Sequence, residues 1–191
     1  NLLARESRWE EALGAYSRLA EEGWNPAEVQ YRRGLALAAQ GDEDEAIKAY
    51  ERALESEPDH VGVQAQLALL HAQHERLDQA TEMLQRAAEL APDDARLHYN
   101  LGNMHARQAV DGGELRNYGY ADAAVRAYRR AIDLDPQLLK AYYNLACVAE
   151  KINVEEGITA WEQYLSVTRD VPSEQEWVMK ARRYLRALKG D

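Results

Sequence analysis

Apolar and small residues recur along this chain at helical spacing, and the recurrence is itself repeated. Ala46, Tyr50 and Ala53 lie at i, i+4 and i+7, so they share one helical face. The Gly41-Asp42 pair marks the end of one helix and the start of the next, and Pro58 cannot continue a helix. The pattern therefore predicts a helix, a tight turn and an antiparallel second helix.

The same pattern returns at fixed intervals. Pro58, Pro92 and Pro136 follow one another at spacings of 34 and 44 residues. One small residue of each first helix keeps this register, at Gly34, Ala68, Gly102 and Ala146. Landmarks that hold a common register indicate an internal repeat. We therefore predict an all-α solenoid built from antiparallel helix pairs.

The pattern of small, bulky, small and proline residues in units of 34 resembles the tetratricopeptide repeat (TPR) family over nearly the whole chain. The resemblance implies a right-handed α-α superhelix. Residues 172–191 are expected to form a capping helix, because repeat arrays end in atypical units. The other predicted units are a partial one at 1–26 that carries Trp9, full ones at 27–60 and 61–94, one with an insertion at 95–138, and a divergent one at 139–171.

The insertion near residues 110–120 adds ten residues to the third unit. Asp111-Gly112-Gly113 is a turn signal, and Asn117-Tyr118-Gly119-Tyr120 is interpreted as a second group of loop formers. Arg116, Tyr118 and Tyr120 are the candidates here for contact with a partner. The alternative is a neutral loop, because insertions at loop tips cost little stability.

Composition and charge exclude several classes of protein. The net charge is −10, and most of the excess acid lies before residue 95. Nucleic-acid binding relies on Lys and Arg to neutralise phosphates, so no nucleic-acid partner is expected. No apolar run approaches the roughly 18 residues that suggest a membrane span. We expect a soluble, cytoplasmic protein, although the chain begins at Asn1 rather than Met, which is compatible with an upstream segment.

Residues that could carry out chemistry are few. His71 and His74 share a helical face, as do His98 and His105, but no cysteine or carboxylate completes a metal-ligand spacing. We therefore expect packing roles for the histidines and no metal. Neither a Gly-rich phosphate loop nor a Gly-x-Ser-x-Gly elbow is present. We expect no catalytic activity and no cofactor.

The TPR resemblance implies that the first helices of the units line a concave groove. Asparagine there can bind an extended peptide, because its amide supplies both a donor and an acceptor. Cationic residues in the groove favour an acidic or C-terminal segment as the ligand. The thiol of Cys147 is expected to react with maleimide in the free protein. The predicted groove residues are Tyr31, Leu35, Arg96, Tyr99, Asn100, Asn103, Arg107, Lys140, Tyr143, Asn144, Cys147 and Lys151.

The predicted function is a non-catalytic protein–protein interaction scaffold that binds a peptide or a partner helix in the groove. One alternative is a homo-oligomeric scaffold, because a repeat array exposes apolar helix faces at its ends. Another is a regulatory arm of a larger multidomain protein. The carboxylate clamp of some TPR proteins is incomplete here, because Tyr99 stands in the place of its first lysine.

Overall fold

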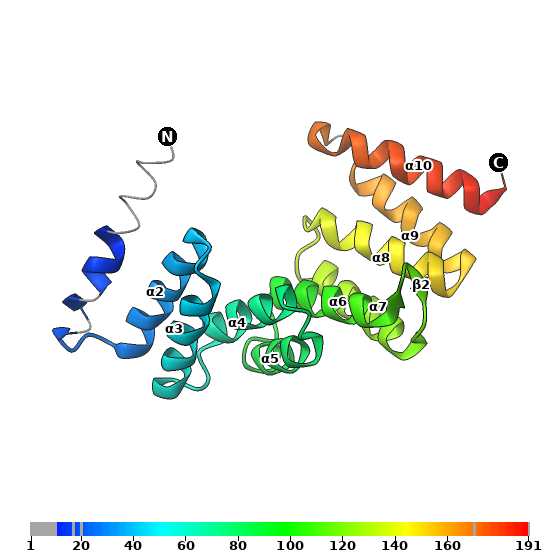
Figure 1. The fold of residues 1–191 in the computed structure, drawn as a ribbon. Helices are drawn as coiled ribbons and strands as arrows, with labels where there is room; N and C mark the ends of the chain where they lie inside the picture. The colour runs from blue at the N-terminus through cyan, green and yellow to red at the C-terminus, as the bar shows by residue number, and fades with distance from the viewer. Residues whose placement is uncertain (1–10, 17, 20, 170, 191) are drawn as a thin grey trace. The chain divides into compact units, whose positions relative to one another are not determined.

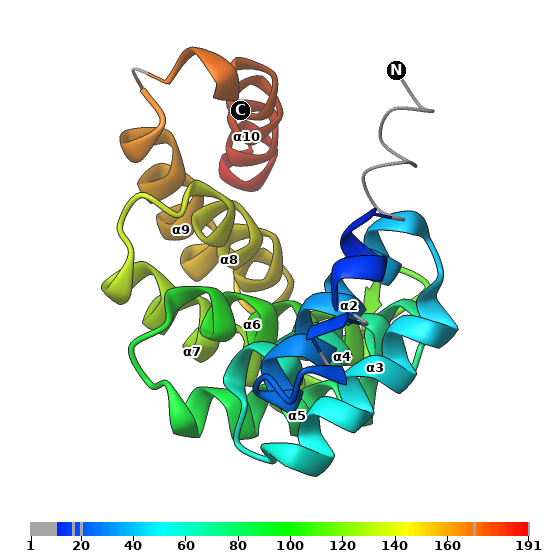
Figure 2. The ribbon, with the colours of Figure 1, turned by 90° about the vertical axis from the view of Figure 1, so that its left-hand side faces the viewer.

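The computed structural model describes residues 11–16, 18, 19, 21–169 and 171–190, so the expectation for Trp9 lies outside the described residues. The described chain is a succession of helices in two compact units, the first ending at Pro92 and the second beginning at Asp93 (Figures 1 and 2). The prediction of an all-α fold is confirmed. The helices are α2 (Pro26–Gln40), α3 (Glu43–Ser56), α4 (Val61–Gln73), α5 (Leu77–Leu90), α6 (Ala95–Ala109), α7 (Tyr118–Leu134), α8 (Leu139–Ile152), α9 (Val154–Val167) and α10 (Gln175–Lys189).

Local sequence sets the ends of these helices. The Asn25 side chain accepts hydrogen bonds from the Ala27 amide (3.0 Å) and the Glu28 amide (3.3 Å), which starts α2. Gly41 ends α2 in the left-handed region, with φ of 92°. The Asp42 amide bonds back to the Leu37 carbonyl at 3.0 Å, and this closes the predicted turn into α3.

A glycine on the first helix of a pair lets a tyrosine ring of the second helix come close. A Cβ atom added to Gly102 of α6 would lie 2.6 Å from the ring of Tyr128 in α7. Gly34 of α2 has the same relation to Tyr50 of α3. Both tyrosines are almost completely buried. The small and bulky positions of the repeat are therefore two halves of one packing contact.

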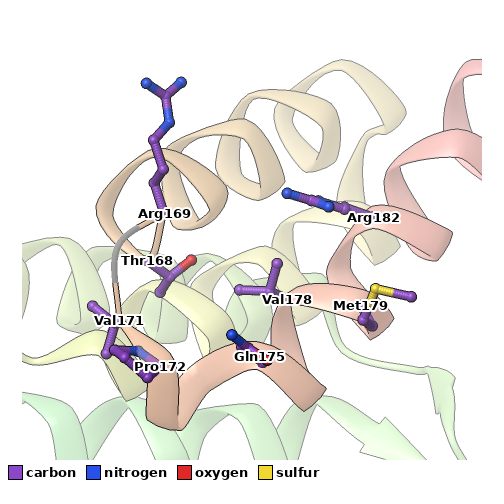
Figure 3. Close-up of a pocket in the computed structure, with 8 residues that line it drawn as sticks. All are labelled: Thr168, Arg169, Val171, Pro172, Gln175, Val178, Met179 and Arg182. Atoms are coloured by element: carbon purple, nitrogen blue, oxygen red, sulfur yellow. The ribbon is translucent and has the colours of Figure 1, made fainter.

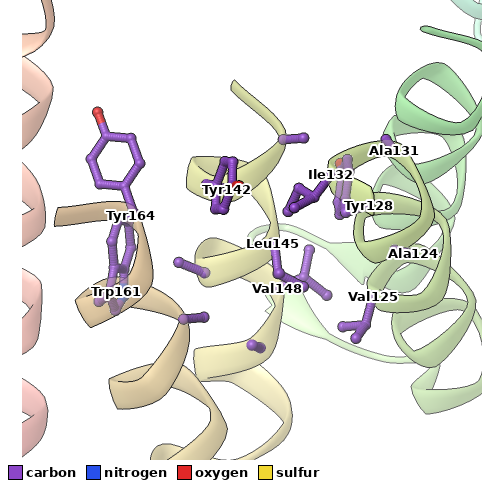
Figure 4. Packing of buried hydrophobic residues seen from close by; sticks show 14 of the residues in the cluster. Ala124, Val125, Tyr128, Ala131, Ile132, Tyr142, Leu145, Val148, Trp161 and Tyr164 are labelled. Carbon is purple, nitrogen blue, oxygen red and sulfur yellow. The ribbon is translucent and has the colours of Figure 1, made fainter. Parts of the chain in front are cut away.

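The core of the second unit runs through α7, α8, α9 and α10 (Figure 4). The divergent repeat places Trp161 and Tyr164 of α9 in this core, and both side chains are fully buried. Gly157 lies against the backbone of Glu150 in α8, so α8 and α9 approach closely despite the large aromatic rings. Ala181 of α10 is also fully buried and belongs to the same core.

The insertion differs from the prediction. Val110–Asp111 (β1) and Glu114–Leu115 (β2) form a short antiparallel hairpin, and Gly112 and Gly113 have the positive φ values that a two-residue turn requires. The prediction that residues 117–120 form a loop is wrong, because α7 begins at Tyr118. Asn117 is the cap, and its Oδ1 accepts a hydrogen bond from the Tyr120 amide at 3.2 Å.

Two further expectations concern membrane-spanning helices and the packing role of the histidines. Within the described residues, no helix combines the length and the apolar character that crossing a membrane requires. His71 and His105 are buried, and burial lowers the pKa of each. Both therefore act as packing residues, as predicted.

Candidate functional site

A cavity of about 220 Å³ opens on the second unit, where α6, α8, α9 and α10 meet. Its volume is below the roughly 300 Å³ at which pockets for whole drug-sized ligands begin, so it suits a single residue of a larger partner. Three of the lining side chains are polar and four are aromatic. The lining residues are Tyr99, Lys140, Tyr143, Asn144, Tyr164, Glu174 and Trp177.

Tyr143 lies at the centre of the aromatic wall. Its ring centroid is 5.1 Å from that of Trp177, 5.2 Å from that of Trp161 and 5.4 Å from that of Tyr164, all in edge-on geometry. Edge-to-face contacts of this kind hold aromatic rings in place. Burial raises the pKa of Tyr143 to about 12, so this ring stays neutral at physiological pH.

Beside this wall, two asparagines are held in fixed orientations. The Tyr128 hydroxyl donates to Asn103 Oδ1 at 2.8 Å, and Asn144 Nδ2 donates to the same oxygen at 2.9 Å. Asn144 Nδ2 also donates to the Tyr99 hydroxyl at 3.3 Å. In the described part of the chain, Asn103 Nδ2 and Asn144 Oδ1 have no hydrogen bond. One amide therefore offers a donor and the other an acceptor.

Two opposite charges line the cavity. Lys140 stands in the first turn of α8, is exposed, and forms no ion pair with any described residue. Glu174 precedes α10, and its Oε2 accepts a hydrogen bond from the Tyr164 hydroxyl at 2.9 Å. Burial, with this contact to the carboxylate, raises the pKa of Tyr164. The cavity therefore carries a cation and an anion against an aromatic wall.

Eight of the twelve predicted groove residues do not line this cavity. Arg96 is exposed and binds the Asp94 carboxylate at 2.8 Å, which holds the pKa of Asp94 below its ordinary value. Asn100 and Arg107 are half-buried on α6. Lys151 donates to the Gly113 carbonyl at 2.9 Å and so holds the hairpin against α8.

Cys147 is half-buried beside the core rather than open to solvent. Burial raises the pKa of its thiol to about 12. Because the thiolate is the reactive form, this cysteine is a poor nucleophile. We therefore expect slow reaction with maleimide in place of the ready reaction that the groove position suggested.

Tyr31 and Leu35 belong to the first unit. The Tyr31 ring lies 4.8 Å from that of His60 and 6.2 Å from that of Tyr50, between ring centroids. Leu35 is half-buried against the core cluster that contains Tyr50. Both side chains are thus held within their own unit's packing.

The insertion presents its candidate residues in different ways. Tyr118 is 64% exposed, whereas Tyr120 stacks on His105 with ring centroids 5.9 Å apart. Arg116 pairs with Glu114 of the hairpin at 2.8 Å. Of the three, only Tyr118 projects its aromatic side chain mostly into solvent.

A second, larger cavity of about 440 Å³ lies between the end of α9 and α10 (Figure 3). Its lining residues on α10 differ from Trp177, which lines the first cavity. Its described lining is apolar and basic: Thr168, Arg169, Val171, Pro172, Gln175, Val178, Met179 and Arg182.

Three residues of the first cavity were missing from the predicted groove. Tyr164 and Trp177 follow the core pattern of their helices, and the sequence assigns them to packing. Glu174 precedes the capping helix and matches no position of the repeat. No sequence signal marks Glu174, because its contact with Tyr164 depends on the path of the segment between α9 and α10. Among the described residues, no group of three His, Cys, Asp or Glu side chains could hold a metal ion.

The helix pairs and their glycine–tyrosine contacts define the class as a helical-repeat protein. Two family models described as Tetratricopeptide repeat match the chain, one over residues 1–61 and the other over residues 37–103. Together they cover more than half of the 191 residues. The chain belongs to the tetratricopeptide repeat family. A comparison with curated proteins finds no match.

Solved structures with this fold are similar over most of their length. The crystal structure of MamA gives a TM-score of 0.74 at 19% identity, over 86% of this chain and 91% of that chain. MamA from Desulfovibrio magneticus RS-1 gives 0.70 at 25% identity, over 87% of both chains. YrrB, described as a TPR protein with an unusual peptide-binding site, gives 0.70 at 24% identity, over 90% of this chain and 84% of that chain.

Proposed function

We propose that this chain is a non-catalytic protein-interaction scaffold that binds an extended peptide on the second unit, along α6 and α8. The observation that carries the proposal is the locked pair Asn103 and Asn144. A peptide backbone offers N–H and C=O groups in alternation. The acceptor on Asn144 and the donor on Asn103 match one of each.

The network gives this pair an advantage over free side chains. Tyr128 is buried and donates to Asn103, so the first amide is anchored to the core. Asn103 in turn fixes Asn144, so both amides are oriented before a ligand arrives. Side chains that are already ordered lose less conformational entropy on binding. The peptide-binding site named for YrrB, a protein of similar fold, is consistent with this use.

Lys140 extends the proposal to the chemistry of the peptide. It lies one turn before Asn144 on α8 and is exposed without an ionic partner among the residues described. An ammonium group at this place attracts a carboxylate. We therefore propose an acidic or C-terminal segment as the ligand.

The test is an array of synthetic peptides with free C-termini, probed with the wild-type chain. The peptides that bind are then titrated by calorimetry against the double variant Asn103→Leu, Tyr128→Phe. The second change removes the hydroxyl that the first would leave unpaired, so the fold is preserved. The dissociation constant should rise at least about tenfold, which corresponds to roughly 1.4 kcal/mol.

Asn100→Leu is the matched control, because Asn100 is a half-buried asparagine of α6 that is not part of the hydrogen-bonded network of Tyr128, Asn103 and Asn144. It should leave the dissociation constant unchanged. Equal affinity of the wild type and the double variant would reject the asparagine pair as the recognition element.

A further inference from the structure

We propose that the cavity bounded by Lys140 and Glu174 receives a C-terminal arginine or lysine of the partner. This inference rests on the proposed function and specifies the last residue of the bound peptide. Such a residue carries both a terminal carboxylate and a side-chain cation. The cavity, with about 220 Å³, has room for one residue and presents the complementary charges.

The position of Glu174 is the first argument. It is the residue that precedes α10, yet its side chain does not cap the helix amides. The carboxylate instead accepts a hydrogen bond from the buried Tyr164 and lines the cavity. No cation in the described part of the chain neutralises it. A half-buried carboxylate of this kind attracts a guanidinium or ammonium group.

The aromatic wall is the second argument. Tyr99, Tyr143 and Trp177 line the same cavity as Glu174. Aromatic faces attract cations, most strongly those of tryptophan and tyrosine. The chain already shows this attraction at the edge of the site, where Lys180 Nζ lies 4.2 Å from the centroid of the Trp177 ring. An arginine or lysine stem also gains apolar contact on these rings.

The terminal carboxylate of the ligand residue has its counterpart in Lys140. Lys140 lies in the first turn of α8, and Leu138, which precedes the helix, provides no side-chain cap for the helix amides. The positive end of the helix dipole and the ammonium group therefore both favour an anion at this end of α8. The acceptor of Asn144, one turn further on, is placed for the amide N–H of the same ligand residue.

Other ligand residues would pair with only one of the two charged residues that line the cavity. An internal acidic residue would satisfy Lys140 and leave Glu174 in contact with apolar groups. An internal basic residue would satisfy Glu174 and leave Lys140 unused. Only a residue that carries both a cation and a carboxylate can pair with both Glu174 and Lys140. In a peptide, a basic C-terminal residue carries both groups.

The test uses the intact chain labelled with ¹⁵N and follows the indole N–H signal of Trp177, assigned with Trp177→Phe. N-acetyl-L-arginine should shift the signal with a dissociation constant on the order of 1 mM, as expected for a ligand of this size. N-acetyl-L-citrulline, which lacks the cation, and N-acetyl-L-arginine amide, which lacks the carboxylate, should each bind at least about threefold more weakly.

Two variants separate the two charges. Glu174→Gln keeps an acceptor for the Tyr164 hydroxyl and should abolish the preference for arginine over citrulline. Lys140→Gln should abolish the preference for the acid over the amide. Glu176→Gln is the matched control, because Glu176 also starts α10 but pairs with Lys180 at 2.9 Å and does not line the cavity. It should leave both preferences intact.

A further pair of probes identifies the source of the residue. Acetyl-Ala-Ala-Arg should bind at least about threefold more tightly than free L-arginine, because its backbone reaches the asparagine pair. The reverse order would overturn the assignment to a polypeptide end.

Equal affinities for N-acetyl-L-arginine, its amide and the citrulline compound would overturn the inference. That result is distinct from failure of the proposed function, which is tested by array peptides and the Asn103 double variant. Peptides that bind through the asparagines without a charge preference would reject this inference alone.

Discussion

The two compact units of the chain contain the same packing contact, but the polar groups next to this contact differ. Gly34 receives the ring of Tyr50 in the first unit, and Gly102 receives the ring of Tyr128 in the second. The residue after the glycine is Leu35 in one and Asn103 in the other. In the first unit the Tyr50 hydroxyl is buried without a hydrogen-bond partner. In the second, the Tyr128 hydroxyl donates to Asn103 at 2.8 Å.

The difference separates the part of the repeat that builds the fold from the part that contributes polar groups to the candidate site. The glycine–tyrosine contact packs the first helix against the second in both of these pairs. The asparagine is not needed for packing, since Leu35 occupies the same register and packs against its own core. It adds an anchored polar group, and the second unit connects this group to a cavity that contains Lys140 and Glu174.

The largest expected effects come from the shared contact. Gly34→Ala and Gly102→Ala each place a methyl group against a buried ring and should lower the free energy of unfolding by about 1–3 kcal/mol. Urea denaturation measures both. Gly14→Ala is the control, because a Cβ at helical Gly14 meets nothing within 4 Å. It should be neutral or stabilising by up to about 1 kcal/mol. Equal stability of all three variants would refute the contact.

The next largest effect is expected in the reactivity of Cys147. This residue follows Ala146 in the fourth repeat unit, as Asn103 follows Gly102 in the third. Its buried thiol, with a pKa raised to about 12, should react with maleimide at least about tenfold more slowly at pH 7.5 than a cysteine peptide does. The rate should continue to rise with pH above 9, where an exposed thiol levels off. Reaction at the peptide's rate would show that the thiol is open to solvent.

The smallest effects separate the two tyrosine hydroxyls. Tyr128→Phe removes a hydrogen bond and should cost about 0.5–1.5 kcal/mol of unfolding free energy. Tyr50→Phe removes a buried hydroxyl without a partner, so it should be neutral or stabilising by up to about 1 kcal/mol. Thermal and urea unfolding measure both changes. Equal losses in the two variants would remove the contrast between the units.

The repeat pattern predicted the fold because packing depends on residue size at helical spacing. Neighbouring residues in the sequence are enough to predict the roles of Gly102 and Tyr128 and the helix end at Gly41. No knowledge of contacts between distant residues is needed. The insertion was predicted less well. Asn117 and Gly119 are loop formers by composition, yet an asparagine that caps a helix has the same composition. The sequence could not distinguish these roles.

The site was predicted in part. Tyr99, Lys140, Tyr143 and Asn144 line one cavity, and they lie on α6 and α8, the first helices of neighbouring repeat units. Glu174 could not be predicted, because its place depends on the path of the segment between α9 and α10. Lys151 was placed in the groove by register, but it binds the hairpin of the insertion, which the repeat pattern does not include.

The central claim is that recognition belongs to the second unit and depends on the anchored asparagines. The most direct measurement is a titration of the ¹⁵N-labelled chain with a peptide selected on the array, following its side-chain N–H signals. The account predicts that the side-chain amides of Asn103 and Asn144 and the indole of Trp177 shift together and saturate. Shifts confined to the first unit, around Tyr31 and His60, with these three signals unchanged, would contradict it.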